Sequence, residues 1–273
     1  MGQLAFKQVD VFTDKPFYGN PVAVVIGGED LDTETMQRIA RWTNLSEATF
    51  LLPSSVADYK LRIFSPSQEL PFAGHPTIGS AHAAIESQFI KVKDGRLTQE
   101  CGAGIIELSV EDRDIFLKAP QPKVADVRGK LPFAKKLLRI DVGPVWITGQ
   151  VATPEELAAL KPDMAALAQF SIDFEATGVT VFAESKEPAS QVHVRSFAPG
   201  HGIPEDPVCG SGNICVAAYL RATNQLERLG NRYVARQGMQ MGRDGRVSVH
   251  VGVEEIRIGG RAVTCVEGTL KAT

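Results

Sequence analysis

The chain carries two similar segments about half its length apart, and this internal repeat constrains the fold more than any other feature. Residues 61–85 and 194–220 each read as a strand, a glycine-rich turn and a helix. The segments start 133 residues apart (194 − 61), whereas Gly74 and Gly210 are 136 apart (210 − 74), so the second copy has three extra loop residues. Solenoid repeats have periods of only about 20 to 50 residues. The sequence therefore predicts two similar domains related by pseudo-twofold symmetry.

Further matches extend the repeat in both directions. Gly102 lies 136 residues before Gly238 (238 − 102), and residues 20–24 (NPVAV) resemble residues 143–147 (GPVWI). These matches indicate an ancient duplication.

A boundary between the two domains is visible where two prolines interrupt the pattern, at residues 119–123 (APQPK). Proline pairs of this kind are typical of connecting segments. We expect an N-terminal domain over residues 1–119, completed by a C-terminal strand at 262–273, and a second domain over 123–261.

Hydrophobic periodicity predicts an α+β fold. Alternating valines such as Val9 and Val11 indicate strands, and residues 31–43 and 154–167 carry helical spacing. Residues 78–85 and 214–220 are small or apolar nearly all round, so helices there must be buried on every side. Each domain is expected to be a curved sheet or barrel around one such central helix.

Composition excludes several classes of function. Hydrophobic residues make up 44% and charged residues 22% of the chain, as in an ordinary globular protein. The formal net charge is -3, without a dense basic run, which argues against nucleic acid or an anionic membrane as partner. No stretch of about 20 apolar residues and no apolar leader is visible. We therefore expect a cytoplasmic protein with a small-molecule partner.

The four cysteines lack the spacing of a metal site or a disulfide framework. They are Cys101, Cys209, Cys215 and Cys265. We expect reduced thiols and no metal.

The two glycine-rich turns lie where the central helices should begin, at Gly74 and at residues 210–212. The first N–H groups of a helix have no internal partner, and the helix dipole adds positive charge there, so both positions favour an anion. A turn that merely caps a buried helix is the alternative. Because two copies match, we favour a site for a small carboxylate.

Groups that can move protons stand close to these turns in the sequence. Glu47 precedes the apolar run 48–52, so partial burial should raise its pKa towards the range of a general base. His75 follows Gly74, and Asp206 and Ser211 flank the second turn. Each also has a structural interpretation: Glu47 as a solvated helix end, His75 as a cap, and Asp206 as a turn residue.

Four motifs occur in order and together resemble the PhzF family, which is named for phenazine biosynthesis. They are residues 19–24 (GNPVAV), 45–47 (LSE), 71–76 (PFAGHP) and 204–212 (PEDPVCGSG). The resemblance covers essentially the whole chain. It implies the diaminopimelate epimerase-like fold, two barrels each around a central helix, and a homodimer.

The resemblance also implies a reaction. The family's best-understood member isomerises trans-2,3-dihydro-3-hydroxyanthranilate without a cofactor, shifting a proton with a glutamate aided by His, Asp and Ser. By motif the catalytic roles fall on Glu47, His75, Asp206 and Ser211, with Glu47 as general acid/base in the cleft between the domains. Substrate-binding roles fall on Gly74, Gly210, Gly212 and Asn20.

One position leaves the mechanism open. Related racemases and epimerases use a cysteine at each helix start, but here the positions hold Ala73 and Cys209, so a symmetric two-thiol mechanism is excluded. Three hypotheses remain: a Glu47-based isomerase, which we favour, a racemase or epimerase that pairs Glu47 with Cys209, and a silent carboxylate-binding protein. Because Cys209 stands at a helix start, we expect it to be the most acidic thiol.

Overall fold

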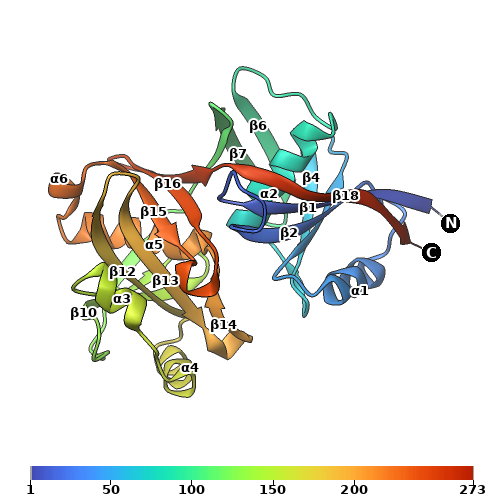
Figure 1. Ribbon diagram of the computed structural model, residues 1–273. Helices are drawn as coiled ribbons and strands as arrows, with labels where there is room; N and C mark the ends of the chain where they lie inside the picture. The colour runs from blue at the N-terminus through green and yellow to red at the C-terminus, as the bar shows by residue number, and fades with distance from the viewer. Residues whose placement is uncertain (1, 273) are drawn as a thin grey trace. The chain divides into compact units, whose positions relative to one another are not determined.

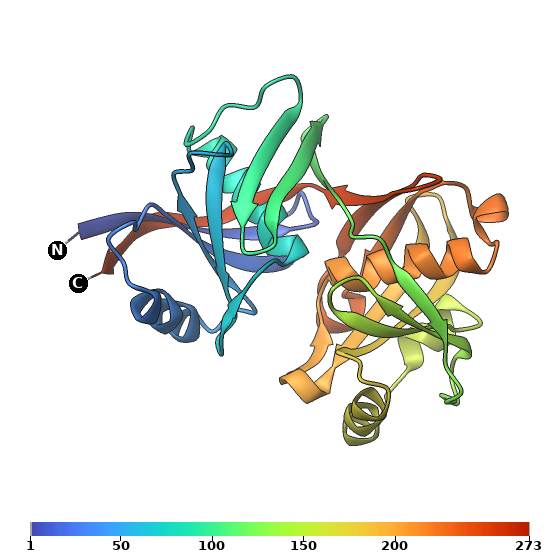
Figure 2. The same ribbon diagram turned by 180° about the vertical axis from the view of Figure 1, so that it is seen from behind.

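The computed structural model describes residues 2–272, which form two compact units (Figure 1, Figure 2). The first unit comprises Met1–Leu117 and Gly259–Thr273, and the second comprises Lys118–Ile258. The last strand, β18 (Ala262–Ala272), runs antiparallel to β1 (Gly2–Val11), so the first and last strands both belong to the first unit. No helix among residues 2–272 combines the length and apolar character needed to cross a membrane.

The first unit is a mixed sheet with the strand order β18–β1–β2–β3–β4–β6–β7–β8. The pairs β2–β3 and β4–β6 are parallel and the other pairs are antiparallel. The short β5 pairs with β4. Besides β1 and β18, its elements are β2 (Asn20–Ile26), α1 (Thr33–Thr43), β3 (Ala48–Leu52), β4 (Tyr59–Phe64), β5 (Glu69–Leu70), α2 (Gly74–Glu86), β6 (Arg96–Cys101), β7 (Gly104–Glu111) and β8 (Asp114–Lys118).

The second unit repeats this topology with the strand order β9–β10–β11–β12–β13–β15–β16. Its parallel pairs, β11–β12 and β13–β15, occupy the places of β2–β3 and β4–β6. Its elements are β9 (Lys123–Asp126), β10 (Lys135–Asp141), β11 (Val145–Gln150), α3 (Pro154–Ala159), α4 (Met164–Asp173), β12 (Gly178–Glu187), β13 (Ser190–Ala198), β14 (Ile203–Asp206), α5 (Gly210–Ala222), α6 (Leu226–Leu229), β15 (Arg232–Gln237), β16 (Gly245–Val251), β17 (Ile256–Gly260), whose end belongs to the first unit, and two short 3₁₀ helices, Pro199–His201 and Met239–Met241.

Each sheet packs around one central helix, as the sequence predicts. Helix α2 contacts β1, β2, β3, β4 and β18, and α5 contacts β9 to β12 and β16. Small residues make this packing possible. A Cβ at Gly79 would lie 2.5 Å from Val22 Cγ1, and a Cβ at Gly212 would lie 2.7 Å from Ser196 Oγ. Larger side chains would therefore push each helix off its sheet.

The outer helices differ between the units. Helix α1 begins after the N-cap Asp32 and buries Met36 and Ala40. The helical spacing over residues 154–167 does not form one helix: α3 ends at Ala159, and α4 begins at Met164. The physical cause is Pro162, because a residue that precedes proline avoids the helical conformation.

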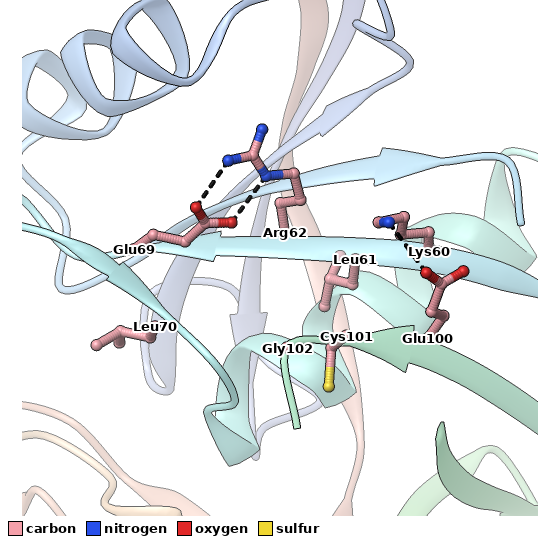
Figure 3. Close-up of a pocket in the computed structure, with 8 residues that line it drawn as sticks. All are labelled: Lys60, Leu61, Arg62, Glu69, Leu70, Glu100, Cys101 and Gly102. Carbon is pink, nitrogen blue, oxygen red and sulfur yellow. Dashed lines mark hydrogen bonds and ion pairs between the residues drawn. The ribbon is translucent and has the colours of Figure 1, made fainter. Parts of the chain in front are cut away.

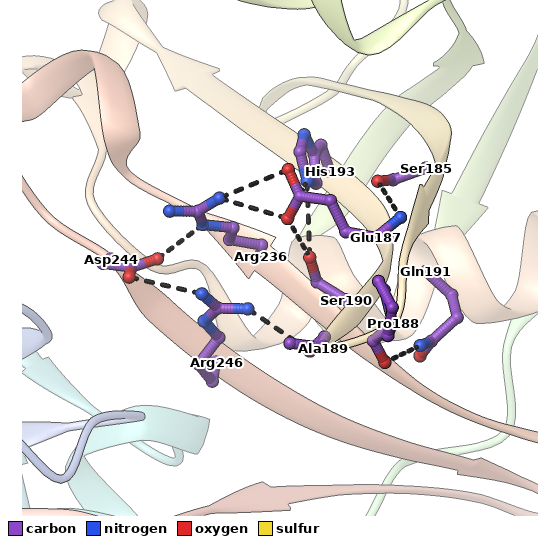
Figure 4. Close-up of polar contacts among 10 residues, drawn as sticks. All are labelled: Ser185, Glu187, Pro188, Ala189, Ser190, Gln191, His193, Arg236, Asp244 and Arg246. Carbon is purple, nitrogen blue, oxygen red and sulfur yellow. Dashed lines mark hydrogen bonds and ion pairs between the residues drawn. The ribbon is translucent and has the colours of Figure 1, made fainter.

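A network of alternating charges ties the β12–β13 hairpin to β15 and β16 (Figure 4). Glu187 lies 3.4 Å from His193 Nε2 and 3.2 Å from Arg236 Nη1. Arg236 Nε donates to Asp244 at 2.6 Å, and Asp244 also pairs with Arg246 at 3.3 Å. Each charged group here has an opposite partner, which is typical of a structural network.

Candidate active site

Glu47 lies immediately before the fully buried strand β3, and its carboxyl is largely withdrawn from water. Its side chain is 16% exposed. Burial raises the pKa of Glu47 to about 7, and a hydrogen bond from Ser46 opposes the shift. Among residues 2–272, none donates a hydrogen bond to Glu47 Oε2. The carboxyl is thus able to exist in both protonation states near neutral pH.

His75, the second residue of α2, brings a ring nitrogen to this carboxyl. His75 Nε2 lies 3.4 Å from Glu47 Oε2, which is long for a hydrogen bond. The His75 side chain is 8% exposed. The backbone of His75 belongs to the first turn of α2, where the N–H of Thr77 donates to the Ala73 carbonyl. The first unit therefore pairs a carboxyl and an imidazole at the start of its central helix.

The glycine at the start of α2 is not required by local packing. A Cβ at Gly74 would meet Leu117 Cδ2 at 3.8 Å, an ordinary contact. Asn20, by contrast, is buried as the first residue of β2, where it pairs with Val11.

The start of α5 carries four residues that the sequence singled out in the second repeated segment: Cys209, Gly210, Ser211 and Gly212. Cys209 is the N-cap, and its Sγ accepts a hydrogen bond from the N–H of Gly212 at 3.3 Å. Ser211 Oγ lies 3.5 Å from the same sulfur. Gly210 and Gly212 are buried. The equivalent N-cap of α2 is Ala73, which has no side-chain hydrogen bond.

The expectation that Cys209 is the most acidic thiol is wrong. Burial raises the pKa of its thiol well above the usual range, and the nearby Asp206 carboxylate raises it further. The hydrogen bonds from Ser211 and the Gly212 N–H act in the opposite direction but are the smaller effect. Desolvation therefore raises the pKa of the Cys209 thiol more than the start of the helix lowers it.

Two buried carboxamides hold the loop that carries Asp206. Gln237 Nε2 donates to the Asp206 carbonyl at 2.9 Å, and Asn213 Nδ2 donates to Gln237 Oε1 at 2.9 Å and to the Cys209 carbonyl at 2.9 Å. The Asp206 carboxylate itself accepts from the N–H of Val208 at 3.0 Å. The loop before α5 is therefore fixed from β15 and from within the helix.

Ser211 receives a hydrogen bond from a residue far away in the sequence. Trp146, on β11, donates from Nε1 to Ser211 Oγ at 2.9 Å. Sequence reasoning did not single out Trp146, Asn213 or Gln237. A signal for Trp146 exists, since it is an aromatic residue in the segment 143–147, whose similar segment 20–24 contains none.

A pocket of about 340 Å³ opens elsewhere in the first unit (Figure 3). It is lined by residues 60–62 of β4, Glu69–Leu70 of β5, and 100–102 at the end of β6. Its charged residues pair with one another, Arg62 with Glu69 at 2.7 Å and Lys60 with Glu100 at 2.9 Å. Glu47 does not line this pocket, and the charged residues that do are already paired.

Comparison with known proteins identifies relatives over the whole chain. A family model described as phenazine biosynthesis-like protein, PhzC-PhzF, matches residues 9–268. The chain is 37% identical to antisense-enhancing sequence 1 of Schizosaccharomyces pombe, over 98% of this chain and 99% of that one. It is 32% identical to a trans-2,3-dihydro-3-hydroxyanthranilate isomerase of Pseudomonas aeruginosa, over 95% and 96%.

Solved structures give the same result for the fold. A PhzF-family phenazine biosynthesis protein of Bacillus anthracis superposes with a TM-score of 0.89 at 26% identity, covering 100% of both chains. Solved epimerases and racemases share the fold at lower identity, which confirms the predicted diaminopimelate epimerase-like architecture. The chain therefore belongs to the PhzC-PhzF family of phenazine biosynthesis-like proteins, and it is an isomerase of the PhzF type.

Proposed function

We propose that this isomerase shifts a proton on a small carboxylate-bearing substrate without a cofactor, with Glu47 as the general acid/base. The observation that carries the proposal is the buried Glu47 carboxyl, with its pKa near 7 and with His75 Nε2 at 3.4 Å. A group with such a pKa is suited both to accept and to return a proton at neutral pH.

In this proposal Glu47 takes a proton from one carbon of the substrate and returns it to another. The intermediate carries negative charge, and His75 stabilises the charge that moves between the substrate and the carboxyl. Because the same carboxyl performs both steps, no second proton carrier is required.

Each unit, taken by itself, offers the start of its central helix for substrate binding. The backbone N–H groups near Gly74 in the first unit and over residues 210–212 in the second suit a carboxylate, as does the positive end of each helix dipole. Ser211 and Asp206 add a hydroxyl and a carboxylate that can contact polar groups of the substrate. Asn20 is proposed as a further binding residue of the first unit.

The two alternatives have less support. A racemase that pairs Glu47 with Cys209 would need a thiolate, and burial raises the pKa of the Cys209 thiol. A catalytically silent binding protein does not account for the raised pKa of the Glu47 carboxyl, because such shifts cluster at catalytic sites.

The proposal is tested by hydrogen exchange catalysed by the purified protein. Trans-2,3-dihydro-3-hydroxyanthranilate, on which the Pseudomonas aeruginosa relative is named to act, is the first probe, followed by a panel of small carboxylates in D₂O. Glu47→Gln should lose at least about 100-fold in deuterium incorporation and turnover, with folding intact. Glu34→Gln, on the exposed face of α1, is the control and should behave as the unaltered protein. Near-normal exchange in Glu47→Gln would refute the assignment.

A further inference from the structure

Trp146 has an unusual position for a tryptophan, because its indole is almost wholly buried and its N–H reaches the start of α5. The residue is 3% exposed, whereas the other tryptophan, Trp42, is 77% exposed. The indole N–H donates to Ser211 Oγ at 2.9 Å. This bond joins β11 to the first turn of the central helix.

The indole N–H restricts the hydrogen bonds that the Ser211 hydroxyl can form. A tryptophan N–H is a donor only, whereas a serine hydroxyl has one donor and two acceptor positions. Because Trp146 occupies an acceptor position of Ser211, the O–H proton is directed to another partner. Among the described groups, the Cys209 sulfur lies 3.5 Å from Ser211 Oγ, and sulfur is a weak acceptor. A ligand oxygen would compete easily for this proton.

The space that holds the indole depends on a glycine on the adjacent strand. Trp146 pairs with Gly178 of β12, and a Cβ at Gly178 would lie 2.8 Å from Trp146 Cζ3. In the register of the parallel strands, Trp146 corresponds to Val22 of the first unit, because Ile147 pairs with Val179 where Ala23 pairs with Ala48. Only the second unit therefore carries a side-chain hydrogen-bond donor at this point of the strand.

We propose that Trp146 is a positioning residue that holds Ser211 as a hydrogen-bond donor to the anionic group of the ligand. The inference rests on the proposed function, which assigns Ser211 to substrate binding. It adds a role for Trp146 within the second unit: through its bond to Ser211, the indole presents an oriented donor at the start of α5.

The hydrogen bond is tested without any substrate, from the indole N–H resonance of ¹⁵N-labelled protein. Trp42→Phe leaves Trp146 as the source of the single indole signal. In this background Ser211→Ala should move the signal upfield, because the hydrogen bond is lost, and Ser171→Ala, which removes a buried hydroxyl of α4, should leave it in place. A signal unchanged by Ser211→Ala would overturn the proposal.

The positioning role is tested by a double-mutant cycle on the affinity for sulfate, measured by calorimetry. Trp146→Phe keeps an aromatic ring but removes the donor, and it should weaken sulfate binding about 5- to 10-fold. In the Ser211→Ala background the same change should have no further effect. Equal weakening in both backgrounds, or no sulfate binding by the unaltered protein, would overturn the proposal.

The cycle is independent of turnover, so it separates the inference from the proposed function. If Glu47→Gln remains fully active, the proposed proton step fails, but the sulfate cycle still decides the role of Trp146. If the cycle fails while Glu47→Gln is inactive, the proton step stands and the positioning role is rejected.

Discussion

Glu47 and Gly178 hold equivalent positions in the two units. In each unit the next residue along the chain pairs with the phenylalanine of the repeated segment, Phe64 or Phe197. A Cβ at Gly178 would lie 2.1 Å from the Phe197 carbonyl oxygen, so no side chain fits there. The two copies thus share a topology, but only the first carries a carboxyl at this point.

The first prediction concerns the stability of Glu47→Gln as a function of pH. The pKa of Glu47 is raised from 4.5 to about 7 in the folded chain. Below pH 4.5 the carboxyl is neutral in both states, and its burial imposes no charge penalty. Above pH 7 the folded protein must bury a charge that the unfolded chain exposes to water, so stability is lost as the pH rises through this interval. The unfolding free energy of Glu47→Gln minus that of the unaltered protein should therefore be roughly 3 kcal/mol larger at pH 8.5 than at pH 4.5.

Urea unfolding of both proteins at the two pH values measures this difference. The control is Glu34→Gln, whose side chain is 83% exposed and should leave the pH dependence unchanged. A constant difference between Glu47→Gln and the unaltered protein would show that the carboxyl is not desolvated.

The second prediction is the pH dependence of turnover. Glu47 must be ionised to accept a proton, so kcat/KM should rise with pH through a midpoint near 7 and level off above it. Steady-state rates from pH 5 to 9 on any substrate found in the exchange assay provide the measurement. A midpoint near 4.5 would mean that the base is an exposed carboxyl and not Glu47.

The third prediction replaces the expectation that Cys209 is the most reactive thiol. Cys265 is only partly buried, whereas Cys101, Cys209 and Cys215 are buried. Burial also raises the pKa values of Cys209 and Cys215. Alkylation of the native protein followed by peptide mapping should therefore label Cys265 first. Cys265→Ser should remove the fast phase, and early labelling of Cys209 would contradict the burial argument.

Features that repeat within the sequence were predictable from it. The matched segments predicted two similar units, and the all-round small residues of 78–85 and 214–220 predicted central helices. Both predictions are confirmed. The two units have the same order of parallel and antiparallel strand pairs. Their central helices are buried and lack room for larger side chains at Gly79 and Gly212.

Features that depend on contacts distant in the sequence were not predictable. The acidity of Cys209 was inferred from its helix start alone, but surrounding elements bury the sulfur. The bond from Trp146 to Ser211 spans 65 residues, and no local pattern indicates it. Sequence spacing shows which face a side chain occupies, but not which strand covers it.

The last prediction compares the stability contributions of two equivalent arginine–glutamate pairs, one in each unit. Each repeated segment carries an arginine that makes a two-point bond to a glutamate: Arg62 to Glu69 in the first unit, and Arg195 to Glu205 in the second. The first pair is 22% and 40% exposed, and the second only 6% and 13%. Breaking a buried pair leaves an unpaired buried charge, which costs about 3 kcal/mol or more, whereas an exposed pair contributes about 1 kcal/mol or less. In chemical unfolding monitored by circular dichroism, Glu205→Gln should therefore destabilise the protein far more than Glu69→Gln. Equal effects would show that burial does not distinguish the two arginines, and a larger effect of Glu69→Gln would reverse the argument.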